Sequence, residues 1–176
     1  EIGADAARFV FLMRSANTQF DFDLDLVLKK SNDNPVFYVQ YGHARTTTML
    51  KRAESEGCGF DASAPPSIEG LARLTLPEER EMLKKISAMA DIVQSAARAC
   101  EPHRLIYFCQ ELIAEFHGYF TRYKKTERVI SDDKELTLAR LSLVAAVKQT
   151  LKNALNILGI SAPDHMEAPV VSVEEE

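Results

Sequence analysis

Most features that would assign the sequence to a membrane, a secretory route or a disulfide-stabilised fold are missing. It has no tryptophan and only three cysteines, and Cys58, Cys100 and Cys109 form no CxxC pair, which favours reduced thiols over disulfides or a zinc site. No apolar run approaches the roughly 20 residues that a membrane helix needs, and the first residues do not resemble a signal peptide. We therefore expect a cytoplasmic protein that makes no membrane contact.

Motifs for catalysis and metal binding are missing as well. There is no glycine-rich phosphate loop and no Ser/His/Asp order with supporting context. Asp21, Asp23 and Asp25 begin like a calcium loop, but Leu26 and Asn32 stand where that loop requires Gly and Glu. The four histidines show no zinc-ligand spacing. The residues alone therefore predict no catalytic, cofactor-binding or metal site in this chain.

What the chain does have is the composition of an ordinary globular domain. Its 176 residues are 46% hydrophobic and 27% charged, enough for one substantial core. A formal net charge of -5 at first argues against nucleic-acid binding. Arg122, Lys124, Lys125 and Arg128 nevertheless crowd one short stretch. They form either a local phosphate-binding patch or a solvated helix end with cations near its C-terminal dipole.

Hydrophobic periodicity and capping residues predict an all-α bundle. A helix over 1–14 is followed by strict alternation over 20–26, which predicts a short strand or extended segment near the N-terminus. Later helices are predicted over 35–55, from 77 to before Pro102, from Pro102 to about 123, and from about 134 to Gly159. The second of these is either continuous or broken near 90–91. Thr75 and Glu78 predict its capping box.

The stretch over 31–45 reads SNDNPVFYVQYGHAR and joins a polar loop directly to a helix. Asn34 is a suitable N-cap, and Pro35 suits the first turn. Amide side chains beside aromatic rings are the groups that bind and stack single-stranded bases. The same residues also fit a capped helix whose aromatic side chains belong to the core.

A second aromatic stripe leads into the basic stretch. Apolar and aromatic residues recur at steps of three and four from Leu105 to Tyr123. Burial alone explains the part up to Phe116. Tyr119 and Tyr123 lie next to the cations that follow, so they belong either to the core or to a surface that holds a nucleic-acid strand.

The stretch over 31–45 resembles the arginyl-tRNA synthetases, in which an Asn/Asp-Pro loop leads into a helix carrying Gln-Tyr-Ala-His-Ala-Arg. This chain keeps that motif except at Gly42, where the family usually has Ala, and the glycine is expected to loosen the helix by up to about 1 kcal/mol. Residues 3–26 are similar to the segment after the family's Lys-Met-Ser-Lys signature. The LARL at 138–141 and the LGISAPDHM at 158–166 resemble the end of its helical anticodon-binding domain.

The resemblance implies a helical bundle of the class I synthetase anticodon-binding type. It implies the end of the catalytic-domain region at 1–30, the anticodon-binding domain at 31–166 and a flexible acidic tail at 167–176. Arginyl-tRNA synthetases join arginine to its tRNA with ATP and magnesium, and their His-Ile-Gly-His and Lys-Met-Ser-Lys signatures are absent here. The chain is therefore expected to be inactive alone and to hold no cofactor. Its expected partners are the anticodon stem-loop of arginine tRNA and its own missing catalytic domain, in a monomeric enzyme.

Some candidate tRNA contacts are implied by the resemblance, and the others, including Arg45 as a phosphate contact, follow from their charge or their aromatic rings. The resemblance implies a loop, a stacking tyrosine and a methionine that contacts a base, while the basic and aromatic residues after the second stripe are candidates for holding the strand. The predicted residues are Asn32, Asp33, Asn34, Pro35, Tyr41, Arg45, Tyr119, Arg122, Tyr123, Lys124, Lys125 and Met166.

Two alternatives stay open. One is a helical protein-interaction module that shares the bundle without reading RNA, and this alternative predicts indifference to RNA. The other is the helical domain of a different synthetase, such as the cysteinyl or bacterial glycyl enzyme. Against the second stands the segment from 20 to 45, which resembles the arginine enzyme specifically.

Overall fold

The computed structural model describes residues 2–15, 18–19, 21–64, 66–123, 125–126 and 128–169. Within these ranges the chain is helical and contains no strand, so the predicted all-α class is confirmed. The helices are α1 (Ala4–Leu12), α2 (Leu24–Leu28), α3 (Pro35–Ser55), α4 (Ile68–Leu71), α5 (Pro77–Ala99), α6 (His103–Tyr123) and α7 (Lys134–Ile157). Of the two alternatives for the helix that begins near 77, the continuous one is confirmed, since α5 shows no break near 90–91. Among the described helices, none combines the length and apolar character that crossing a bilayer requires.

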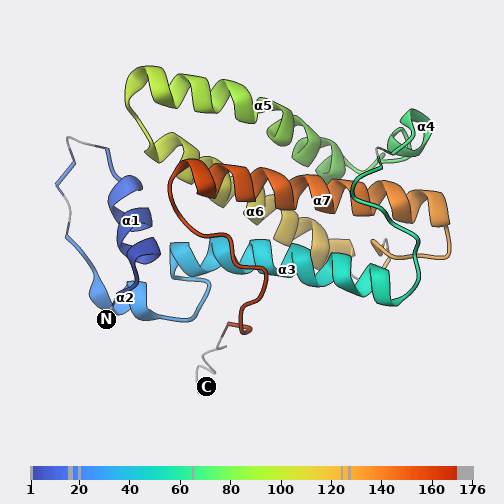
Figure 1. The fold of residues 1–176 in the computed structure, drawn as a ribbon, viewed down its shortest axis with the longest axis horizontal. Helices are drawn as coiled ribbons and strands as arrows, with labels where there is room; N and C mark the ends of the chain where they lie inside the picture. Colours follow the sequence, from blue (N-terminus) through green and yellow to red (C-terminus); the bar gives the residue numbers. More distant parts are fainter. Residues whose placement is uncertain are drawn as a thin grey trace.

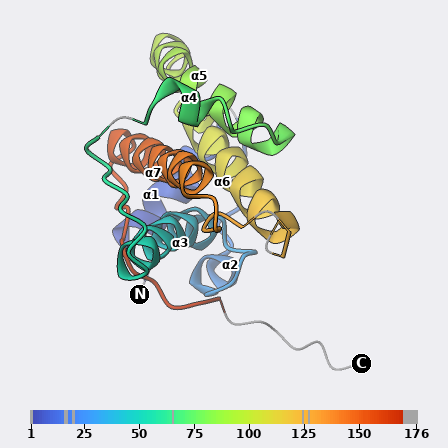
Figure 2. The ribbon, with the colours of Figure 1, turned by 90° about the vertical axis from the view of Figure 1, so that its right-hand side faces the viewer.

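Four long helices form the bundle, and the short α1 and α2 lie at one end of it (Figure 1). The central helix is α7, as its long apolar stripe predicted: it contacts α3, α5 and α6 (Figure 2). Helix α5 packs mainly against α6 on the far side from α3. The core between them includes the fully buried Ile106, Leu112, Leu141 and Leu151.

Local capping sets the starts of α3 and α7, two of the four long helices of the bundle. Before α3, the Asn34 side chain accepts hydrogen bonds from the amides of Val36 and Phe37 at 3.1 and 3.4 Å. Before α7, the Asp133 carboxylate accepts one from the Leu136 amide at 3.1 Å. Because these caps satisfy amides that have no partner within the helix, both starts follow directly from the sequence.

Two local predictions are wrong. The alternating segment is extended only up to Asp23, whose carboxylate caps α2 by accepting a hydrogen bond from the Leu26 amide at 2.9 Å; Phe20 lies outside the described residues. The predicted capping box of Thr75 and Glu78 is not formed: α5 begins one residue later, after Leu76, whose amide donates to the Glu79 carboxylate at 3.0 Å. In both places a side-chain cap outweighs the pattern seen along the sequence.

Gly42 is a close-approach residue, which corrects the interpretation of this glycine as a mere loosening of the helix. It is buried on α3, where a Cβ would collide with Cγ1 and Cδ1 of Ile113 on α6. The missing side chain therefore lets two helices of the core pack closely.

Candidate nucleic-acid interface

A cavity of about 800 Å³ opens beside α3, at the end of α6. Its other walls come from residues 128–130, in the segment after α6, and from residues 165, 166 and 168, in the chain end that follows α7. Its lining residues are Tyr41, Ala44, Arg45, Thr48, Met49, Arg52, Tyr119, Phe120, Tyr123, Arg128, Val129, Ile130, His165, Met166 and Ala168. Among these described residues there are three arginines and one histidine, and no aspartate or glutamate. The cavity therefore combines aromatic and aliphatic walls with positive charge.

Tyr41, Arg45, Tyr123 and Met166 meet at this cavity, as the predicted site requires. The Tyr41 ring stacks on Phe37, with ring centroids 5.7 Å apart and planes 9° from parallel. The Arg45 guanidinium carbon lies 4.4 Å from the centroid of the Phe120 ring. Both side chains are therefore held in place by aromatic contacts within the protein.

Tyr119 is a core residue, which corrects its assignment as a tRNA-binding residue. Its side chain is 2% exposed, and its hydroxyl donates to Glu79 Oε1 at 3.1 Å. The aromatic stripe of α6 thus stays in the core one turn longer than predicted. Tyr123, one turn later, is partly exposed and donates to Glu78 at 2.9 Å, a hydrogen bond that raises the pKa of Tyr123.

The basic residues at the end of α6 and just after it do not all lie at the cavity. The exposed Arg122 forms an ion pair with Glu78, at the start of α5, and does not line the cavity. Lys125 is exposed and also outside the lining, and Lys124 lies outside the described residues. Arg128 lines the cavity instead. A phosphate contact from Arg122, Lys124 or Lys125 therefore stays a prediction.

The loop before α3 does not line the cavity either. Asn34 is 4% exposed, and its amide donates to the carbonyls of Val27 and Lys29 at 2.7 and 2.9 Å. Since its oxygen caps α3, the whole side chain is used within the fold, and Asn34 shapes the loop instead of reading a base. Asn32 and Asp33 are exposed, and Pro35 opens the helix. Contacts from these three to RNA stay a prediction.

The face of α3 that carries Gln40, His43 and Thr47 has a role that the sequence analysis missed: it holds the segment that follows α7. Gln40 Nε2 donates to the Ser161 carbonyl at 3.0 Å, and His43 Nδ1 lies 2.9 Å from the Pro163 carbonyl. A carbonyl only accepts, so His43 Nδ1 carries the proton. Burial lowers the pKa of His43, which keeps the ring neutral. Figure 1 shows this red segment crossing α3.

A third contact completes this attachment. The Thr47 hydroxyl donates to the Asp164 carboxylate at 2.9 Å, and Lys148 on α7 lies 3.0 Å from the same carboxylate. These hydrogen bonds lower the pKa of Asp164. Because Asp164 comes directly before His165 and Met166, the attachment brings both residues to the cavity.

His117 lies behind the aromatic residues of α3 and is uncharged at neutral pH. Its ring meets Tyr38 edge-on, with centroids 5.2 Å apart, and its centroid is 6.5 Å from that of Tyr41. Burial lowers the pKa of His117 to about 4, and the charge of Arg45 adds to this effect. A neutral ring here avoids placing a second cation beside Arg45.

Sequence reasoning did not single out Arg52, Phe120 or His165, and it considered Arg128 only as part of the basic stretch. Arg52 follows Tyr41 and Arg45 along one face of α3, so helical spacing could have indicated it. Phe120 and His165 had no such signal, because their place at the cavity depends on how distant segments meet. Among the described residues, no group of three His, Cys, Asp or Glu side chains is arranged to hold a metal ion.

Comparison with known families gives a direct result. The family model of the DALR anticodon binding domain matches residues 39–166. This chain belongs to that family. The DALR domain accounts for α3 to α7 and for the chain end up to Met166.

Relatives of the DALR chain are arginine–tRNA ligases, which confirms the resemblance. The ligase of Desulfosudis oleivorans is 49% identical over 166 residues, covering 94% of this chain and 29% of the relative. That of Acinetobacter baumannii (strain AYE) is 48% identical, covering 94% of this chain and 27% of the relative. The solved arginyl-tRNA synthetase of Thermus thermophilus has a TM-score of 0.76 and 28% identity over 92% of this chain and 26% of that one. The chain thus spans under a third of these proteins.

Proposed function

We propose that this chain is the anticodon-binding part of an arginine–tRNA ligase, and that it recognises the anticodon stem-loop of arginine tRNA through the cavity beside α3. One observation carries this proposal. A chain with a formal net charge of -5 has a cavity lined by three arginines, a histidine and several aromatic side chains, with no carboxylate among the described lining residues. This is the combination that an unpaired base and its phosphates require.

Different residues of the cavity contact the phosphates and the bases of the RNA. Arg45, Arg52 and Arg128 supply charge for phosphates, which fix the position of the strand. Tyr41 and Met166 supply surface against which a base can pack. Because Phe37 already stacks on Tyr41, the receiving ring is ordered before RNA arrives, and binding loses less conformational entropy.

The reaction of the whole enzyme is part of the same proposal. ATP and magnesium would be bound by the catalytic part that carries the two signatures, and this chain contains neither signature. On this account the chain alone does not activate arginine. It acts together with its own catalytic domain, in a monomeric enzyme of the cytoplasm, by placing the tRNA.

Titration with two tRNAs tests the proposal. The chain is titrated with arginine tRNA and with a tRNA of different anticodon, over a series of salt concentrations. We expect tighter binding of the arginine tRNA, an affinity that falls steeply with salt, and loss of the preference when the arginine anticodon is changed. Indifference to every RNA would favour the protein-interaction module. Preference for cysteine or glycine tRNA would favour another synthetase.

A further inference from the structure

The LARL motif at 138–141 has no role in the site described so far, yet its arginine is among the most buried charged residues of the chain. Arg140 is 3% exposed and Glu79 is 0% exposed. Arg140 Nε donates to Glu79 Oε1 at 2.8 Å. Glu79 also accepts hydrogen bonds from the Tyr119 hydroxyl and the Leu76 amide, at 3.1 and 3.0 Å. The pair therefore joins α5, α6 and α7 at one point.

Stability alone is a weak reason for such a pair. Removing two charges from water costs as much as their attraction returns, so buried ion pairs add little to stability unless they also fix a geometry. Here the pair fixes the position of a backbone segment, through the other end of the Arg140 guanidinium. Its Nη1 donates to the backbone carbonyl of Arg128 at 2.9 Å, in the segment between α6 and α7.

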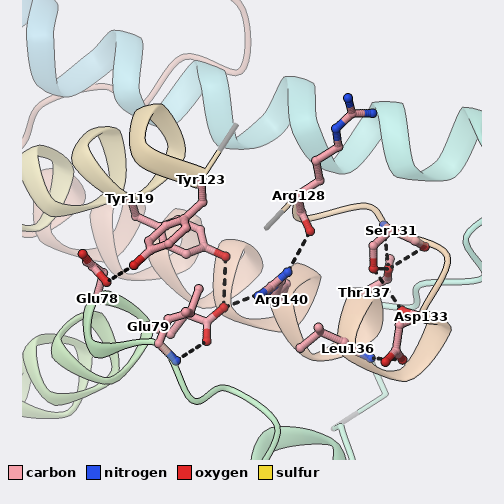
Figure 3. A network of polar contacts seen from close by, with 11 residues as sticks. Glu78, Glu79, Tyr119, Tyr123, Arg128, Ser131, Asp133, Leu136, Thr137 and Arg140 are labelled. Atoms are coloured by element: carbon pink, nitrogen blue, oxygen red, sulfur yellow. Dashed lines mark hydrogen bonds and ion pairs between the residues drawn. The ribbon is translucent and has the colours of Figure 1, made fainter. Parts of the chain in front are cut away.

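Figure 3 shows the consequence for Arg128. Its carbonyl faces Arg140, while its side chain points the opposite way, toward α3. Arg128, Val129 and Ile130 all line the cavity. Fixing the carbonyl of Arg128 therefore sets the wall of the cavity that faces Arg45 and Arg52.

A second contact holds the same segment from α7. The Ser131 amide donates to the Thr137 hydroxyl oxygen at 3.0 Å, and the Thr137 hydroxyl lies 3.2 Å from the Ser131 carbonyl. Thr137 is 3% exposed. Residues 128–131 are thus attached to α7 at both ends, by Arg140 and by Thr137.

We propose that Arg140, oriented by Glu79, is a positioning residue that presents Arg128 to a phosphate of the bound RNA, with Thr137 as its second support. The inference rests on the proposed function. It gives the motif arginine a role in binding without any contact to RNA. Arg128 makes the contact, and Arg140 determines where Arg128 stands.

Two substitutions release the segment in different ways. Arg140→Lys keeps a cation beside Glu79, but one compact ammonium does not replace a planar fork that donates in two directions. Thr137→Val keeps the shape of the side chain and removes the three contacts of its hydroxyl with the amide, the carbonyl and the hydroxyl of Ser131. Ser142→Ala is the matched control, since Ser142 also lies on α7 but donates to the Leu138 carbonyl of its own helix.

Amide hydrogen exchange, measured without RNA, tests whether Arg140 and Thr137 hold residues 128–131 in place. Amides of residues 128–131 should exchange faster in Arg140→Lys and Thr137→Val than in the wild type, while Ser142→Ala leaves them unchanged. Unchanged exchange in both test variants would overturn the proposal. This result does not depend on whether the chain binds RNA, so it separates failure of the positioning role from failure of the proposed function.

A double-mutant cycle tests the link to binding. In the wild type, Arg128→Gln should lower the slope of log affinity against log salt for the arginine stem-loop by about 0.7, the value for one phosphate contact on a single strand. In the Thr137→Val or Arg140→Lys background, Arg128→Gln should have little further effect. Arg52→Gln should have its full effect in every background. Equal effects of Arg128→Gln in all backgrounds would contradict the positioning role, whereas no RNA binding by the wild type would contradict the proposed function.

Discussion

At the scale of single residues, Tyr41 is the most direct test of base stacking. Tyr41→Ala should weaken binding of the arginine anticodon stem-loop by about 1 to 3 kcal/mol, because a base loses its aromatic partner. Tyr41→Phe is the control, since it keeps the ring that stacks on Phe37. Affinity is measured by titration of the stem-loop. An unchanged affinity in Tyr41→Ala would remove Tyr41 from the site.

Gly42 makes a second prediction at this scale, and two effects oppose each other. Alanine improves the helix by about 1 kcal/mol, whereas its methyl group overlaps Ile113 at a cost of about 1 to 3 kcal/mol. We expect Gly42→Ala to lower the free energy of unfolding, measured in urea.

Shortening Ile113 should reverse the sign of the stability change caused by Gly42→Ala. In the Ile113→Ala background, Cγ1 and Cδ1 are gone and only the Cβ at 3.4 Å remains, an ordinary contact distance, so Gly42→Ala should raise stability through helix propensity. If Gly42→Ala destabilises equally in both backgrounds, close packing against Ile113 is not the reason for the glycine.

At the scale of elements, two neighbouring faces of α3 make two different sets of contacts. One face carries Tyr41, Arg45 and Arg52 to the cavity, and another holds the chain end through Gln40, His43 and Thr47. Thr47→Val should lower the free energy of unfolding by about 1 kcal/mol, since the Asp164 carboxylate loses a hydrogen bond. It should also weaken stem-loop binding, because Met166 follows Asp164 closely.

The control for this prediction is one residue away. Thr48 lines the cavity, so it controls for stability alone; its hydroxyl donates to the Ala44 carbonyl within its own helix, at 3.0 Å, and to no other element among the described residues. Thr48→Val should therefore leave the free energy of unfolding nearly unchanged. Equal losses from Thr47→Val and Thr48→Val would show that the attachment of the chain end does not depend on Thr47.

The elements themselves were largely predictable because their ends are local. Asn34 and Asp133 cap α3 and α7 with their own side chains, and Gly57 and Gly159 follow the two helices with φ of 68°. The element predictions that were wrong have one of two causes: a contact with a distant part of the fold, or a competing side-chain cap nearby in the sequence. Glu79 is buried and holds both the Leu76 amide and Arg140 of α7, so it takes the place predicted for Glu78, and no spacing along the sequence indicates the contact with Arg140.

At the scale of the whole molecule, stability should depend on pH through His117. Its pKa is about 4 in the folded chain, whereas an unfolded histidine has a pKa of about 6.5. The folded state is therefore fully stabilised above pH 6.5, and as the pH falls toward 4 the unfolded state gains protons that the folded state does not. Between pH 7 and pH 5 this difference should reduce the free energy of unfolding by about 2 kcal/mol.

Comparison with His117→Asn isolates this contribution. His43 acts in the same direction, because burial lowers its pKa as well, so part of the pH dependence should persist in the variant. Carboxylates such as Asp133, whose pKa is lowered by hydrogen bonds from Arg73 and Leu136, lose their contribution only at more acidic pH. Urea unfolding at pH 7 and pH 5 measures the difference. Parallel losses in wild type and variant would contradict a buried neutral His117.

The site was predictable only in part, because it is a property of the whole molecule. Tyr41 and Met166 were predicted from the resemblance and Arg45 as a phosphate contact, and all three line the cavity. Tyr119 and Tyr123 look alike in the sequence, one turn apart on one stripe, and only the approach of α5 decides that Tyr119 is buried against Glu79. Arg128 reaches the cavity because α7 holds its backbone, which no pattern along the chain indicates.

The most direct test uses the five methionines of the chain as reporters. Met49 and Met166 line the cavity, Met82 is fully buried, and Met13 and Met89 lie outside the cavity. Methyl NMR spectra are recorded while the arginine anticodon stem-loop is added. We predict that the Met166 and Met49 signals shift with increasing RNA, that Met82 stays in place, and that a stem-loop with a changed anticodon shifts Met166 much less. Binding that shifts Met13 or Met89 and leaves Met166 unchanged would contradict the account.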